Sequence, residues 1–213
     1  MRKLARFLFW TAVVLGVVGG VLRATLFRPW TLPDDLTLAA SVGPTLAGGD
    51  VVLVLTKGTP GFGDLVRCAD PEDATRFVVG RIAGLDGDVV ETEGATLLVN
   101  GKRYEGEMAC NDGTFTVAHP TTGADVQLLC DVVNMGGGWH YRGHVNKAAF
   151  HSLHTKTQVG RGMVYLLSDD RDFHDDSRDF GPLPAESCKE RIVVRLVSKL
   201  GWSDSKSRLS YIH

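Results

Sequence analysis

An uninterrupted apolar stretch near the N-terminus constrains this chain more than any other feature. Residues 7–22 read FLFWTAVVLGVVGGVL without a charge, and the apolar character resumes after Arg23 as far as residue 27. This length suits a helix that spans a bilayer, which needs roughly 20 residues. Because no A-x-A-like cleavage site follows closely, we expect residues 1–30 to be a retained membrane anchor, with a cleaved secretory signal as the alternative. Either one takes residues 31–213 out of the cytoplasm.

Charge is divided unevenly between this segment and the rest of the chain. Residues 1–30 hold five basic side chains and no acidic one, so residues 31–213 hold 18 basic and 25 acidic side chains, a net charge of −7. An acidic body argues against nucleic acid as a partner. We expect membrane lipid as a partner of the N-terminal segment, and the body on the extracytoplasmic side of a single-pass anchor.

The body has the pattern of a mostly β protein. The run Val51–Leu55 (VVLVL) predicts a strand that is buried on both faces, and Asn100-Gly101 predicts a tight hairpin turn. Residues 104–160 are polar and rich in glycine, and we interpret them as an inserted β lobe. Further strands are predicted at Leu65–Val66, Phe77–Leu85, Val89–Thr92, Thr96–Val99, Val164–Leu167 and Ile192–Val197.

The chain has four cysteines and a cluster of histidines. Cys110 and Cys130 bracket a turn-rich stretch and are the preferred disulfide pair, with two free buried thiols as the alternative. The histidines have loose spacing in a glycine-rich setting, so we expect solvated surface side chains and no metal site. They are His140, His144, His151 and His154.

Three motifs, in order along the chain, resemble those of the type I signal peptidases, which are membrane-anchored Ser/Lys serine endopeptidases. Residues 41–50 (SVGPTLAGGD) are similar to S-M-x-P-T-L-x-x-G-D, and residues 80–88 (GRIAGLDGD) to K-R-x-V-G-L-P-G-D. Residues 168–178 (SDDRDFHDDSR) resemble G-D-N-R-D-N-S-x-D-S-R. The resemblance implies a mostly antiparallel β fold with one N-terminal transmembrane helix and a smaller β lobe between the second and third motifs, and it implies no cofactor.

The same resemblance implies a catalytic chemistry that this sequence only partly retains. In the family a serine attacks the scissile carbonyl, and a buried neutral lysine is its general base. The serine corresponds to Ser41, but the lysine corresponds to Gly80, which has no side chain and cannot take a proton. The position of the oxyanion hydroxyl is Ala39.

A second alignment with the family places the nucleophile at another residue. The family's leader E-P-F-x-I-P-S-G-S is similar to residues 28–35, which lie five positions too far upstream of Ser41. Counted from this leader, the nucleophile position is Leu36 instead.

One residue of the third motif, His174, favours catalytic activity. His174 replaces the serine that neighbours the lysine amine in the family, and an imidazole is the usual base of a serine nucleophile. We therefore consider a relocated Ser41–His174 pair as a hypothesis. The alternatives are an inactive site and a base outside these motifs. In the family the charged residues of this motif brace the site from behind, which here assigns that role to Asp169, Arg171, Asp172, Asp176 and Arg178.

The first functional hypothesis is a signal-peptidase-like endopeptidase that processes signal peptides of secretory preproteins at the outer face of the membrane. Substrate would add as a strand beside the Ser41 segment and the strand that holds Val79, Gly80 and Ile82. The alternative is an inactive pseudo-peptidase that binds signal peptides or a partner, and a less favoured one is a structural subunit of a secretion or conjugation machine.

Overall fold

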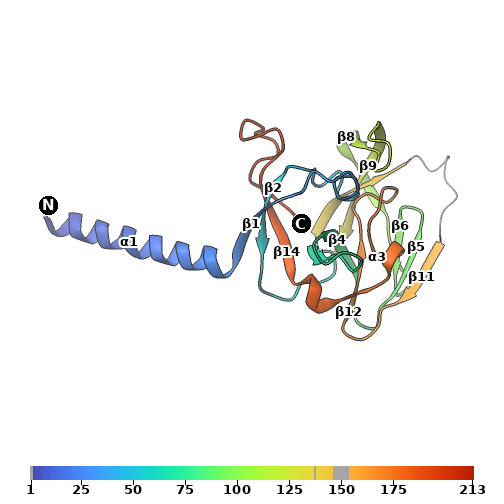
Figure 1. The fold of residues 1–213 in the computed structure, drawn as a ribbon, viewed down its shortest axis with the longest axis horizontal. Helices are drawn as coiled ribbons and strands as arrows, with labels where there is room; N and C mark the ends of the chain where they lie inside the picture. The colour runs from blue at the N-terminus through green and yellow to red at the C-terminus, as the bar shows by residue number, and fades with distance from the viewer. Residues whose placement is uncertain (1, 137, 146–153) are drawn as a thin grey trace.

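The computed structural model of this chain describes residues 2–136, 138–145 and 154–213. Antiparallel strands make up its body, and one long helix projects from it at the N-terminal end (Figure 1). The elements are α1 (Arg2–Thr25), β1 (Phe27–Thr31), α2 (Leu36–Ser41), β2 (Val51–Leu55), β3 (Leu65–Ala69), β4 (Phe77–Gly84), β5 (Val89–Glu93), β6 (Thr96–Val99), β7 (Lys102–Tyr104), β8 (Gly106–Ala118), β9 (Asp125–Met135), β10 (Gly138–His144), β11 (His154–Gln158), β12 (Met163–Leu167), α3 (Ser177–Phe180), β13 (Leu183–Pro184), η2 (Ala185–Cys188), β14 (Glu190–Val197) and β15 (Ser210–Tyr211).

The strands form three sheets. The largest has the order β1-β2-β14-β3-β4-β12-β13, and β15 pairs with β14. The two smaller sheets have the orders β10-β9-β8 and β11-β5-β6-β7. Every pairing between these strands, over the residues that the structure describes, is antiparallel. The prediction of a mostly β, antiparallel fold is confirmed.

The segment interpreted as an inserted lobe, residues 104–160, is divided between two sheets. Its strands β8, β9 and β10 form a sheet of their own, whereas β11 pairs with β5. Residues 146–153, which include His151, lie outside the described part of the chain.

The N-terminal helix α1 has exposed apolar side chains, among them Phe7 and Trp10. Over the described residues, no helix combines the length and the apolar character that crossing a membrane requires. The transmembrane helix predicted from residues 7–27 is therefore not supported by the structure.

Two local predictions can be compared with the backbone. Asn100 and Gly101 both have positive φ, 51° and 80°, as the turn between β6 and β7 requires, so the hairpin is confirmed. The strand Val51–Leu55 is also confirmed, but its expected burial on both faces is wrong. Val52 and Val54 are fully buried while Val51, Leu53 and Leu55 are half-buried, because only one face of β2 packs into the core.

A cluster of buried side chains seats α2 and the turn after it against the large sheet. Leu38 and Val42 pack with Val52 and Val54 of β2 and with Val79 of β4. The position of Ser41 follows from this packing, because Ser41 is the last residue of α2.

Candidate active site

Ser41 is enclosed by the surrounding protein. Asp35 caps α2, and its side chain accepts a hydrogen bond from the Leu38 N–H at 2.9 Å, so the segment before Ser41 is helical instead of extended. The Ser41 side chain is fully buried, and its Oγ donates to the Leu38 carbonyl oxygen at 3.0 Å. The hydroxyl is therefore satisfied within its own helix and does not reach solvent.

Strand β8 covers the turn that follows Ser41. A Cβ atom placed on Gly43 would lie 2.9 Å from Phe115 Cε2 and 3.1 Å from Val117 Cγ1, both on β8. Glycine at position 43 thus allows β8 to pack directly against this turn. This contact also covers the turn next to Ser41 on the side that faces the β10-β9-β8 sheet.

Gly80 is tightly packed at the position where a side chain would begin. It lies on β4 opposite Val66 of β3, and a Cβ atom on it would lie 3.3 Å from both Leu166 Cβ and the Leu167 carbonyl oxygen. Its neighbours Val79 and Ile82 are each 1% exposed. The three residues predicted to contact substrate therefore lie inside the sheet, and β4 is paired with β3 on one side and with β12 on the other.

Side chains of the third motif form two buried ion pairs. Arg81 Nε lies 2.7 Å from Asp169 Oδ1, and Arg178 Nη2 lies 2.7 Å from Asp176 Oδ2. Asp169 also accepts a hydrogen bond from Thr45 Oγ1 at 2.5 Å. The motif is joined to Ser41 itself through the backbone, because the Asp170 N–H donates to the Ser41 carbonyl oxygen at 3.0 Å.

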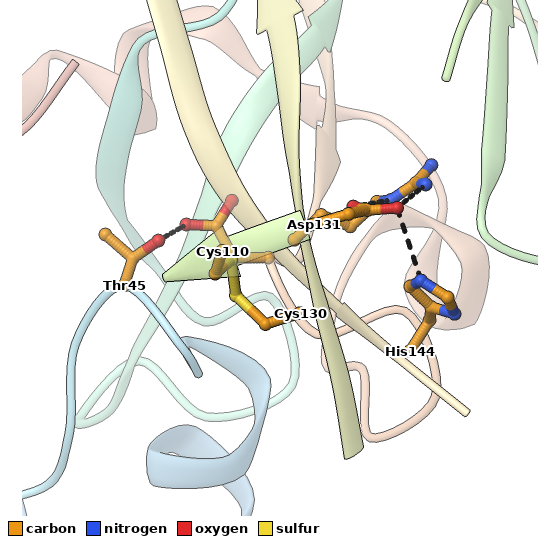
Figure 2. Close-up of a disulfide and its surroundings, with 7 residues drawn as sticks. Thr45, Cys110, Cys130, Asp131 and His144 are labelled. Atoms are coloured by element: carbon orange, nitrogen blue, oxygen red, sulfur yellow. Dashed lines mark hydrogen bonds and ion pairs between the residues drawn. A yellow bond between two sulfur atoms is a disulfide. The ribbon is translucent and has the colours of Figure 1, made fainter. Parts of the chain in front are cut away.

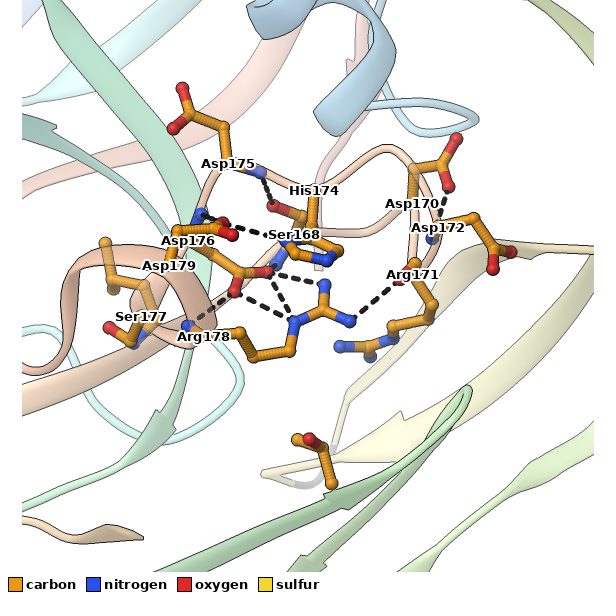
Figure 3. A network of polar contacts seen from close by, with 12 residues as sticks. Ser168, Asp170, Arg171, Asp172, His174, Asp175, Asp176, Ser177, Arg178 and Asp179 are labelled. Atoms are coloured by element: carbon orange, nitrogen blue, oxygen red, sulfur yellow. Dashed lines mark hydrogen bonds and ion pairs between the residues drawn. The ribbon is translucent and has the colours of Figure 1, made fainter. Parts of the chain in front are cut away.

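Figure 3 shows Arg171 and Asp172 beside the other residues of the third motif. Both also bind the backbone near the end of β10: the Arg171 N–H donates to the Gly143 carbonyl oxygen at 2.8 Å, and Asp172 Oδ2 accepts from the Val145 N–H at 2.5 Å. The two residues therefore attach the third motif to the end of β10.

His174 has a partner, but the partner is not Ser41. Its Nδ1 lies 2.8 Å from Asp179 Oδ2, and its side chain is 25% exposed. Among the described residues no hydrogen bond joins His174 to Ser41. His174, Asp176 and Asp179 lie close enough to share a metal ion, but Arg178 and the Ser168 N–H already bind the Asp176 carboxylate, and we assign no metal to them.

A second polar cluster lies in the three-stranded sheet. Arg142 forms a hydrogen-bonded ion pair with Asp131, and His144 Nε2 lies 3.2 Å from the same carboxylate. Burial raises the pKa of Asp131, but hydrogen bonds from His144 and Arg142 outweigh this and hold it at about 2. The hydrogen bond to Asp131 raises the pKa of His144.

A disulfide joins β8 to β9 close to this cluster (Figure 2). Cys110 pairs with Cys130, and the figure shows this bond between Thr45 on one side and the Asp131–His144 pair on the other. Cys68 pairs with Cys188 in a second disulfide, which the sequence analysis did not propose.

The expectation of solvated surface histidines is wrong for His140, which is 4% exposed. Burial, followed by the charges of Arg81 and Arg171, holds the pKa of His140 well below 6.5, so the ring is neutral. The sequence did not indicate this burial. Inward-facing positions of β10 are occupied by glycine and polar residues, and not by the apolar side chains that would mark a buried face.

A family model for the signal peptidases of peptidase family S26 matches residues 4–197 of this chain. The chain belongs to the S26 signal peptidase family. A curated S26 relative, signal peptidase I P of Bacillus subtilis subsp. natto, is 31% identical over 112 residues. That match covers 50% of this chain and 57% of the relative, so the chain spans little more than half the length of the relative it matches. The ion pairs Arg81–Asp169 and Arg178–Asp176 both lie within the residues that the family model matches.

Proposed function

We propose that this chain engages the signal peptides of secretory preproteins, as an S26 signal-peptidase-like protein, without cleaving them through Ser41. Membership of the S26 family supports signal peptides as the partner. One observation carries the absence of cleavage: Gly80 offers no amine where the family has its general base. The buried Ser41 hydroxyl, which donates to Leu38, agrees with it.

The mode of binding follows from the state of α2. An extended peptide would add beside the Ser41 segment only if that segment were itself extended, because strand addition uses backbone N–H and C=O groups that a helix has already paired. We therefore propose that peptide binding in this place requires α2 to unwind or to move away from β4.

A second candidate function is an endopeptidase that uses Ser41 with His174 as the base. The observation that favours it is the 2.8 Å contact between His174 Nδ1 and Asp179, because a carboxylate on one ring nitrogen orients the other toward a serine in Ser-His-Asp enzymes. This candidate also requires Ser41 to leave its buried position.

Cleavage and binding by the full chain distinguish these functions. A preprotein with an intact signal peptide is incubated with wild type, Ser41→Ala and His174→Ala, and His154→Ala provides a control on an exposed histidine of β11. We expect no cleavage by any variant and equal binding of the signal peptide by wild type and Ser41→Ala. Cleavage lost in Ser41→Ala and His174→Ala would establish the endopeptidase, while equal cleavage in all variants would exclude the pair. Absence of both cleavage and binding would overturn the proposed function.

We place the body outside the cytoplasm, attached to the membrane by its N-terminal segment. Two disulfides support an oxidising compartment, and the exposed apolar side chains of α1 support contact with lipid. Fractionation of cells with and without residues 2–25 tests this. We expect the full chain in the membrane fraction and the shortened chain outside it.

A further inference from the structure

Nearly every buried arginine of the described residues has a carboxylate of its own. One pair ties two strands of the large sheet, another links that sheet to the third motif, a third joins β9 to β10, and a fourth lies within the third motif. They are Arg67–Glu190, Arg81–Asp169, Arg142–Asp131 and Arg178–Asp176. Arg171 is 5% exposed, and no carboxylate oxygen among the described residues lies within 4.0 Å of its guanidinium.

Within the described residues, hydrogen bonds fix the backbone of Arg171 but not its guanidinium. The Arg171 N–H donates to the Gly143 carbonyl oxygen, and the Arg171 carbonyl oxygen accepts from Arg178 Nη1, both at 2.8 Å. Its Nε and Nη1 atoms are shielded from solvent and have no hydrogen-bond partner in the described part of the chain. Figure 3 shows the side chain below that of Arg178 and directed away from the carboxylates of Asp170 and Asp172.

The charges around Arg171 make this burial unfavourable. Burial and then the charges of Arg142 and Arg178 lower the pKa of Arg171 to about 9, although the charges of Asp169 and Asp176 raise it in part, so the guanidinium is charged at neutral pH. The two carboxylates next to it in sequence, Asp170 and Asp172, form no ion pair with it: Asp170 Oδ1 accepts from the N–H groups of Asp172 and Phe173, and Asp172 Oδ2 accepts from the Val145 N–H. A buried charge without a counter-ion is strongly destabilising, so a counter-ion from outside the chain is favoured.

His140 adds a second unpartnered donor to this buried region. Its Nε2 has no hydrogen-bond partner, and its pKa is lowered in part by the charge of Arg171. A neutral imidazole can carry its proton on Nε2 and donate it to an anion. Because His140 and Arg171 are 4% and 5% exposed, an anion bound to both would be largely enclosed by protein.

We propose that the Arg171 guanidinium binds a small monovalent anion, of the size of chloride, beside the third motif and β10. The anion supplies the counter-charge that the other buried arginines receive from carboxylates. This site is independent of the proposed function, because it needs neither Ser41 nor a signal peptide.

Thermal unfolding of the full chain tests the site. Sodium gluconate is replaced stepwise by sodium chloride at constant ionic strength, so that screening of surface charges stays the same. We expect chloride to raise the Tm of the wild type by about 3 °C or more with saturation, as binding to the native state alone does. Arg171→Met should lose this rise. Arg67→Met, which removes a buried arginine of the large sheet, should have a lower Tm in gluconate but keep the rise.

An equal chloride response in wild type and Arg171→Met, or no response in the wild type, would overturn the proposal. If Arg171→Met does not fold, crystals of the wild type soaked in sodium bromide decide the question. An anomalous bromide peak against the Arg171 guanidinium supports the site, and a map without one there rejects it.

Discussion

Arg81 of β4 and Asp169 of the loop after β12 form an ion pair of 2.7 Å in which each side chain is 1% exposed. The pair connects the second motif of the sequence to the third. Thr45 of the first motif donates to the same carboxylate, so a single buried aspartate joins all three motifs. These contacts tie the three motifs together without any side chain at position 80.

We expect Arg81→Met to destabilise the fold severely. It leaves the Asp169 carboxylate buried without its counter-charge, and breaking such a pair costs about 3–5 kcal/mol. Urea unfolding of the full chain measures the loss. The control is Arg103→Met, whose partners Glu93 and Glu105 are exposed, and we expect it to change the free energy of unfolding by less than about 1 kcal/mol. Equal losses in the two variants would contradict the role given to the buried pair.

Gly80→Lys should not restore cleavage. The new Cβ atom meets Leu166 and the Leu167 carbonyl oxygen at 3.3 Å, and the Ser41 hydroxyl is directed at Leu38 instead of at β4. Crowding of this kind costs about 1–3 kcal/mol, and Gly80→Ala separates that steric cost from the cost of burying an amine. Signal-peptide cleavage and urea unfolding are the measurements. Cleavage by Gly80→Lys that disappears in a double variant with Ser41→Ala would show that the site is open.

Asp170→Asn should flatten the dependence of stability on pH. Burial raises the pKa of Asp170 to about 6, although the N–H groups of Phe173 and Asp172 lower it in part. A carboxyl with a raised folded pKa binds its proton more tightly in the native state, so the wild type loses stability as pH rises from 4 through 6. The loss is about 2–3 kcal/mol, and the asparagine variant lacks it. Urea unfolding at pH 4 to 8 measures both curves, and parallel curves would refute the assignment.

The two disulfides should differ in both strength and accessibility. Cys68 and Cys188 are 120 residues apart and Cys110 and Cys130 are 20 apart, so removing them should cost about 5 and about 3 kcal/mol in the loop-entropy model. Cys110 is half-exposed whereas Cys68 and Cys188 are buried, so mild reductant should open the Cys110–Cys130 bond first. Timed alkylation followed by mass spectrometry gives the order. Earlier labelling of Cys68 would contradict it.

Much of the fold was accessible from local patterns. Asn100-Gly101 predicted its hairpin because both residues tolerate positive φ, and Val51–Leu55 predicted a strand with the correct bounds. The helix α2 was missed, although Asp35 before LTLAAS is an N-cap signal. Residues 28–35 were matched to the leader of the family instead, so the capping signal at Asp35 was not used.

The sequence by itself determined the family, because membership depends only on which residue types occupy which positions along the chain. It did not determine whether Ser41 is accessible, what His174 contacts or which buried arginine lacks a carboxylate. Those properties arise between residues far apart in the chain: β8 covers the turn after Ser41, Asp179 binds His174, and Arg171 is enclosed at the end of β10. Burial and charge pairing depend on distances between residues that are far apart in the sequence, and only the packing of the sheets sets these distances.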